Sequence, residues 1–194
     1  FRMRSKWHHT TSFTHCYDAK FNISEDIPFK AKNFFPSYFE TVQFERKSNK
    51  LTSNMVGKKA PDWVLKDVKS NEVELSKLKS KVLVIQFTGI GCGPCHHSVP
   101  FVKQLVEDYK DKDFEFVSIE TWSNNIDGLK RYQERNEFNF KFLKSNDDVN
   151  KAYDISSVPA FFIIDENRII REVIRGYQKN LTDSKIIENI NMLL

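Results

Sequence analysis

Apolar residues gather into short runs from about residue 60 onward, and the spacing within each run indicates the element that it forms. Residues 82–87 are apolar at almost every position, which is typical of a strand covered on both faces in a parallel sheet. Residues 94–110 place apolar side chains along one stripe, as an amphipathic helix does: Val99, Val102, Val106 and Tyr109. A buried strand that leads into an amphipathic helix is therefore the first unit predicted.

The rest of this region alternates between strand and helix patterns. Further strands are predicted at 63–65, 73–75, 114–119, 160–164 and 169–174, and further helices at 126–136, 147–153 and 186–193. The first two of these strands and the last two are separated by short polar turns, so each pair is predicted to form a hairpin. The alternation predicts an α/β fold with helices on both faces of one sheet.

Residues 1–55 follow a different pattern. Apolar positions alternate at period two from 13 to 23, and 38–44 is a second strand-like run. We therefore expect a small β-rich extension, or the tail of an upstream domain, over 1–55, and the main domain over 56–194. The chain begins at Phe1 without a charged and apolar leader, and we interpret it as a processed or excised piece whose start says nothing about export.

Composition narrows the possible functions only modestly. Of 194 residues 40% are hydrophobic, and 17 are phenylalanine, so the chain can build a core without disulfide staples. Thirty basic against 26 acidic residues give a net charge of +4, which is too small to indicate a nucleic-acid partner. The longest wholly apolar run, 160–164, is far shorter than the roughly 20 residues of a membrane span, so no span is expected in this chain.

The chemistry of the chain is concentrated in Cys92-Gly93-Pro94-Cys95, between the buried strand and the amphipathic helix. A helix N-terminus presents unpaired N–H groups and a partial positive charge, which favour a thiolate over a thiol. The spacing lets the second sulfur reach the first, so the pair can attack a disulfide and then resolve the mixed disulfide. Three cysteines are too few for a disulfide-built scaffold, and Cys16 has no obvious partner.

Several further segments match one family in their order and separation. They are the entry segment 57–67, the strand and turn 71–78, Pro100 inside the helix, Ser157-Val158-Pro159, and Arg175-Gly176-Tyr177. Together with the cysteine pair, these segments resemble the TlpA/ResA-like thiol–disulfide oxidoreductases, a thioredoxin-fold branch of the AhpC/TSA-redoxin superfamily. The resemblance covers residues 56–194 and implies a thioredoxin-like fold with a central mixed sheet.

The resemblance also implies roles for individual residues. Cys92 would be the exposed nucleophile and Cys95 the deeper resolving thiol. Val158, Pro159 and Gly176 would line the substrate groove, and a cis Val158–Pro159 bond would present the Val158 backbone to an extended client strand.

The partners and location follow from the same resemblance. The chain would reduce disulfides in exported client proteins and receive electrons from a membrane or soluble thiol donor, without a diffusible cofactor or metal. Its location would be the bacterial periplasm or another extracytoplasmic space, with an anchor in a missing N-terminal part as one arrangement.

The chain departs from the family pattern beside the cysteines. Gln86 stands where thioredoxin has a buried acid, Ser98 where the TlpA/ResA-like branch often has a glutamate, and Gly91 where a tryptophan usually precedes the first cysteine. His97 is a candidate for the missing proton transfer, although it can equally face solvent with its neighbour His96. Trp122 either borders the active-site surface or is an ordinary core or rim aromatic.

Other interpretations remain open. The chain can be a thioredoxin-like binding module with vestigial thiols, or a peroxiredoxin-like thiol peroxidase, although Gly89 replaces the threonine that such a peroxidase needs. The letters CxxCH also match a c-type haem site with His96 as ligand, and the two cysteines with a histidine can bind zinc, although a second ligand pair is missing. The N-terminal His8, His9, His15 and Cys16 match no ligand spacing, so no metal site is predicted there.

Overall fold

The computed structural model describes residues 2–4, 11–13 and 54–194, and the chain divides into two units, 1–49 and 50–194. In the first unit, β1 (Arg2–Arg4) pairs antiparallel with β2 (Thr11–Phe13). The strands predicted at 13–23 and 38–44 lie outside the described residues, except that Phe13 ends β2. The assignment of 1–55 as a separate extension stays a prediction.

The second unit is built on a seven-stranded sheet in the order β4-β3-β7-β6-β5-β8-β9. β5 runs parallel to β6, and β6 to β7, whereas every other neighbouring pair is antiparallel, so the sheet is mixed as predicted. The strands are β3 (Val64–Asp67), β4 (Glu72–Glu74), β5 (Val82–Thr88), β6 (Phe114–Glu120), β7 (Lys141–Lys144), β8 (Ala160–Ile164) and β9 (Ile170–Arg175).

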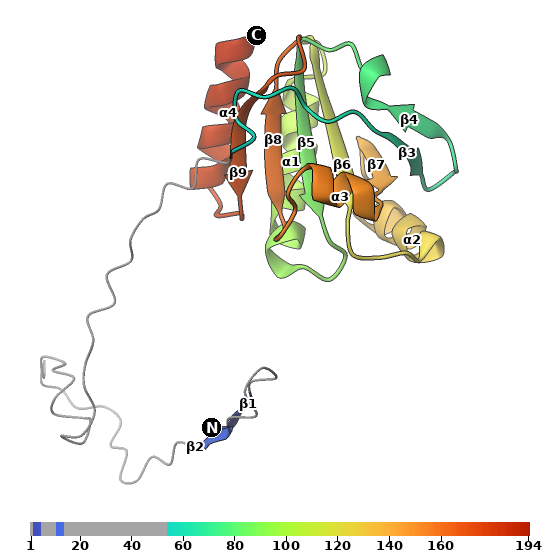
Figure 1. Ribbon diagram of the computed structural model, residues 1–194, viewed down its shortest axis with the longest axis vertical. Helices are drawn as coiled ribbons and strands as arrows, with labels where there is room; N and C mark the ends of the chain where they lie inside the picture. The colour runs from blue at the N-terminus through green and yellow to red at the C-terminus, as the bar shows by residue number, and fades with distance from the viewer. Residues whose placement is uncertain (1, 5–10, 14–53) are drawn as a thin grey trace, which may run out of the picture. The chain divides into compact units, whose positions relative to one another are not determined.

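Helices cover both faces of this sheet, and Figure 1 shows α3 in front of it and α1 behind it. The helices are α1 (Gly93–Asp108), α2 (Ile126–Asn136), α3 (Asp147–Ala152) and α4 (Leu181–Leu193), with a 3-10 turn at Leu75–Lys77. Three of them have an asparagine at the N-cap: Asn125 before α2, Asn146 before α3 and Asn180 before α4. The Asn125 side chain accepts the Gly128 N–H at 3.0 Å, and the Asn146 side chain accepts the Val149 N–H at 2.9 Å.

The core explains why β5 is apolar at most of its positions. Its side chains alternate between two clusters: Val82 and Val84 pack with α1 and α4, whereas Leu83, Ile85 and Phe87 pack on the opposite face. On that opposite face, α3 and residues 55–63 supply the covering side chains, including Tyr153. Both faces of β5 are therefore buried, so its sequence does not alternate between apolar and polar residues.

Two details differ from the sequence prediction. β7 was missed because its four residues carry lysine at both ends, and only Phe142 and Leu143 between them are buried. Along α1 the buried apolar side chains are Val102 and Leu105, whereas Val99, Val106 and Tyr109 of the expected stripe are only half-buried. In the described part of the chain, no helix combines the length and apolar character needed to cross a membrane.

Candidate functional site

The two cysteines of the motif lie where β5 passes into α1. Cys92 is the N-cap residue of α1, and its Sγ accepts the Cys95 backbone N–H at 3.2 Å. The two side chains form a disulfide, with Cα atoms 5.2 Å apart. Cys92 is 6% exposed and Cys95 1% exposed, so the first sulfur is the more accessible of two well-covered groups. The helix N-terminus thus points an amide donor at the sulfur expected to act as nucleophile.

The loop before β8 lies against this sulfur. The Val158–Pro159 peptide bond is cis, as the resemblance implied. The Val158 carbonyl oxygen is 3.7 Å from Cys92 Sγ. The Gly176 N–H donates to the Pro159 carbonyl at 2.7 Å, and Gly176 has φ +82°, a backbone conformation that favours glycine. The structure therefore brings Cys92, Val158, Pro159 and Gly176 into one connected surface.

A buried chain of neutral hydrogen bonds lies behind Cys95. The Ser118 hydroxyl donates to Gln86 Oε1 at 3.2 Å, and Gln86 Nε2 donates to Ser98 Oγ at 2.9 Å. The Ser98 hydroxyl in turn donates to the Cys95 carbonyl at 2.7 Å. Gln86 and Ser98, singled out separately in the sequence as missing acids, are therefore partners. Their hydrogen bond places a neutral polar contact in the buried region beside Cys95.

The two histidines after the motif are exposed on the first turns of α1, whereas Ser98 points inward. This placement agrees with the interpretation that His96 and His97 face solvent. A proton-transfer role for His97 stays a prediction.

A buried carboxylate at the end of β6 ties two loops together, and sequence reasoning missed it. Glu120 is only 1% exposed. Its Oε2 accepts the Ile90 N–H at 2.7 Å, and its Oε1 accepts the N–H groups of Trp122 at 2.8 Å and Ser123 at 2.9 Å. Burial raises the pKa of the Glu120 carboxyl, against the opposing effect of these three donors. The available signal was an acidic residue that directly ends an apolar strand.

Comparison with known proteins places this site in a family. The model of the Redoxin family matches residues 55–190. The chain belongs to the Redoxin family. This redoxin is 29% identical over 140 residues to the thiol-disulfide oxidoreductase ResA of Geobacillus kaustophilus, an alignment that covers 72% of this chain and 80% of the relative. It is 28% identical over 138 residues to ResA of Bacillus subtilis, covering 71% and 75%.

Solved structures share the fold of the redoxin. The thioredoxin domain of a thiol-disulfide oxidoreductase from Bacteroides vulgatus superposes with a TM-score of 0.63 at 21% identity, over 73% of this chain and 100% of that one. A thioredoxin-family thiol:disulfide interchange protein from Chlorobium tepidum gives 0.63 at 19% identity, over 73% and 99%. The thioredoxin-like fold is therefore confirmed, and the ResA relatives confirm the family resemblance and the predicted class of enzyme.

Trp122 stands beside the redox loop of the redoxin. A Cβ atom added at Gly89 would lie 2.5 Å from two carbons of the Trp122 ring, so the indole rests directly on the Gly89 backbone. The Gly89 carbonyl accepts the Cys92 N–H at 3.0 Å. Trp122 is nevertheless 60% exposed. Of the two interpretations open from the sequence, the structure therefore favours the one in which Trp122 borders the active-site surface.

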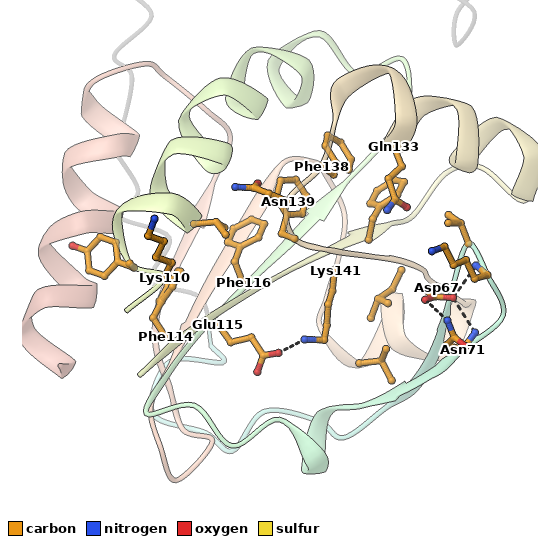
Figure 2. Close-up of a pocket in the computed structure, with 18 residues that line it drawn as sticks. Asp67, Asn71, Lys110, Phe114, Glu115, Phe116, Gln133, Phe138, Asn139 and Lys141 are labelled. Atoms are coloured by element: carbon orange, nitrogen blue, oxygen red, sulfur yellow. Dashed lines mark hydrogen bonds and ion pairs between the residues drawn. The ribbon is translucent and has the colours of Figure 1, made fainter. Parts of the chain in front are cut away.

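A separate pocket of about 520 Å³ contains neither cysteine (Figure 2). Its walls come from the end of α1, the start of β6, the segment around β7 and the β3–β4 turn, and Lys141 and Glu115, which form an ion pair, are among the residues that line it. The redox site is therefore separate from this cavity. Within residues 54–194, no group of three or more histidine, cysteine, aspartate or glutamate side chains is placed to hold a metal ion.

Proposed function

We propose that this redoxin reduces disulfide bonds in exported client proteins through the Cys92–Cys95 pair. The observation that carries the proposal is the disulfide at the N-terminus of α1, with the Val158 carbonyl 3.7 Å from Cys92 Sγ. One reactive sulfur and one free backbone acceptor lie side by side. An extended client segment that pairs with the Val158 backbone would bring its own sulfur to Cys92.

The exchange proceeds in two displacements. The Cys92 thiolate attacks one client sulfur, the client S–S bond breaks, and the departing client thiolate takes up a proton. Cys95 then loses its proton and attacks Cys92 Sγ, which breaks the mixed disulfide and releases the second client thiolate for protonation. The client gains two electrons and two protons, and the redoxin ends as the Cys92–Cys95 disulfide. A thiol donor, membrane-bound or soluble, must then reduce this disulfide for the next cycle.

The direction of the exchange depends on the reduction potential of the pair. We would equilibrate the Cys16→Ser chain in graded glutathione buffers, alkylate the free thiols and count the adducts by mass spectrometry. A reversible two-electron transition below about −220 mV supports a reductant, and one near −120 mV would indicate an oxidant instead. No transition would favour the binding module with vestigial thiols. A Cys95→Ser variant, which cannot resolve, should accumulate mixed disulfides with clients, whereas a Cys92→Ser variant should not.

We extend the proposal to the location of the protein, the periplasm or another extracytoplasmic space of a bacterium. Its support is the similarity to the ResA oxidoreductases, together with the proposed client class. Labelling of intact cells with a membrane-impermeant maleimide tests it: Cys92 should be labelled after mild reduction if the site lies outside the cytoplasmic membrane, and should stay protected if it lies inside.

A further inference from the structure

We propose that Trp122 determines client specificity in this redoxin, favouring client segments that carry an apolar or aromatic side chain next to the attacked cysteine. This inference rests on the proposed function and adds to it the class of substrate. Trp122 lies in the loop after β6, outside the cysteine motif, and three observations support its role: where the indole rests, how it is held, and how much of it stays exposed.

The indole rests on the backbone that leads into the nucleophile. Contact with Gly89 is so close that an added Cβ would come within 2.5 Å of the ring. The Gly89 carbonyl accepts the Cys92 N–H at 3.0 Å, so a single residue connects the ring to the first turn of the redox motif. The Val158 carbonyl oxygen, the backbone acceptor, lies 3.7 Å from Cys92 Sγ. Cys92 is thus linked to both features: its Sγ is near the Val158 carbonyl, and its N–H is bonded to the residue on which the indole rests.

Glu120 holds the backbone of the loop that carries the indole. One carboxylate binds both the Ile90 N–H, in the loop before Cys92, and the N–H groups of Trp122 and Ser123. Hydrogen bonds to a charged acceptor are stronger than neutral ones, and these three hold the two loops in a fixed relation. The Thr121 N–H adds a bond to the Thr88 carbonyl at 2.9 Å. Glu120 is accordingly a positioning residue that acts through Trp122 and Ile90.

The exposed part of the ring provides the recognition chemistry. Trp122 is 60% exposed although tryptophan has the largest apolar side chain, and it contacts the loop that leads into Cys92, where a client docks under the proposed function. Packing of an aromatic or apolar side chain against an indole ring stabilises a complex by a modest free energy. Expressed as a ratio of kcat/KM, this free energy corresponds to a preference of about 2-fold to about 10-fold. The preferred client has a large apolar residue next to the attacked cysteine, and the other has a small polar residue there.

The test uses the full chain and two peptide disulfides that differ only in the residue next to the cysteine, leucine in one and serine in the other. The measured quantity is the ratio of kcat/KM for the two peptides. Trp122→Ala should lower this ratio by about 2-fold to 10-fold, through a higher KM for the leucine peptide, and Trp122→Phe should restore most of it. Met192→Ala is the matched control, because Met192 is 67% exposed near the end of α4 and should leave the ratio unchanged.

Glu120→Gln tests the positioning role. An amide cannot accept hydrogen bonds at both of its ends, so at least one of the two loops is released, and the ratio should fall part of the way towards the Trp122→Ala value through KM. A Trp122→Ala ratio equal to that of the unaltered chain overturns the inference, as does an equal loss on both peptides. If the unaltered chain reduces neither peptide, the proposed function fails as well, so the two failures are distinguishable.

Discussion

The Gln86–Ser98 hydrogen bond can be tested by a double-mutant cycle in which the two partners are removed singly and together. Ser98→Ala removes the hydroxyl that donates to the Cys95 carbonyl, which costs about 0.5–1.5 kcal/mol in the free energy of unfolding. It also leaves Gln86 Nε2 without its acceptor at a buried position, which costs about 1–3 kcal/mol more. A total destabilisation of about 1.5–4.5 kcal/mol is therefore expected for the single variant.

In a Gln86→Met chain the amide is already absent, so Ser98→Ala should then cost only the bond to the Cys95 carbonyl. The difference between the two backgrounds is a coupling energy of about 1–3 kcal/mol. Equilibrium urea unfolding of the four oxidised chains measures it, provided that the slope of the transition stays the same in all four. A coupling energy below about 0.5 kcal/mol would mean that the two side chains act independently, and the neutral network beside Cys95 would be refuted.

Three further predictions concern stability. Burial raises the pKa of Glu120 above its ordinary 4.5, so the unfolding free energy of the unaltered chain should decline relative to that of Glu120→Gln as the pH rises from 4.5 through the raised pKa. Urea unfolding at a series of pH values measures this difference, and a difference that stays constant with pH contradicts the prediction. Gly176→Ala should destabilise the fold by about 1–2 kcal/mol because Gly176 has φ +82°. Gly128→Ala should stabilise the fold by about 0.5–1 kcal/mol, because Gly128 lies inside α2 and an added Cβ would make only ordinary van der Waals contacts. Thermal unfolding that shifts both variants in the same direction would be inconsistent with this pair of predictions. Tyr153→Phe should cost about 1 kcal/mol in urea unfolding because its hydroxyl donates to the Pro61 carbonyl at 2.8 Å, and no loss would contradict that bond.

The sequence predicted those parts of the fold whose patterns are local. β5 and α2 follow directly from their apolar spacing, and the hairpin of β8 and β9 follows from a polar turn between two apolar runs. β7 was not predicted because its pairing with β3 and β6, and not the pattern of its own four residues, makes it a strand.

The same holds for the candidate site, of which the sequence predicted only the parts that depend on local patterns. The cysteine motif and the Val158-Pro159 loop are recognisable from a few adjacent letters, and the structure brings them together. The partnership of Gln86 with Ser118 depends on the register that sets these two residues opposite each other on β5 and β6. The contact of Trp122 with Gly89 likewise depends on two loops that meet at the ends of neighbouring strands. The register between strands is fixed by the whole sheet, so it cannot be predicted from any short segment of the sequence.

The central place of β5 in the sheet has a consequence for hydrogen exchange. Its backbone is paired with β6 on one side and β8 on the other, over most of its length. Amide protons within β5 donate to one or the other of these two strands, and both faces of the strand are covered by the core, so exchange requires that a strand pairing and the packing around it open, which approaches unfolding of the whole sheet. The loop that leads to Cys92 begins where this strand ends, so the redox pair is attached to the backbone that should exchange most slowly in the sheet.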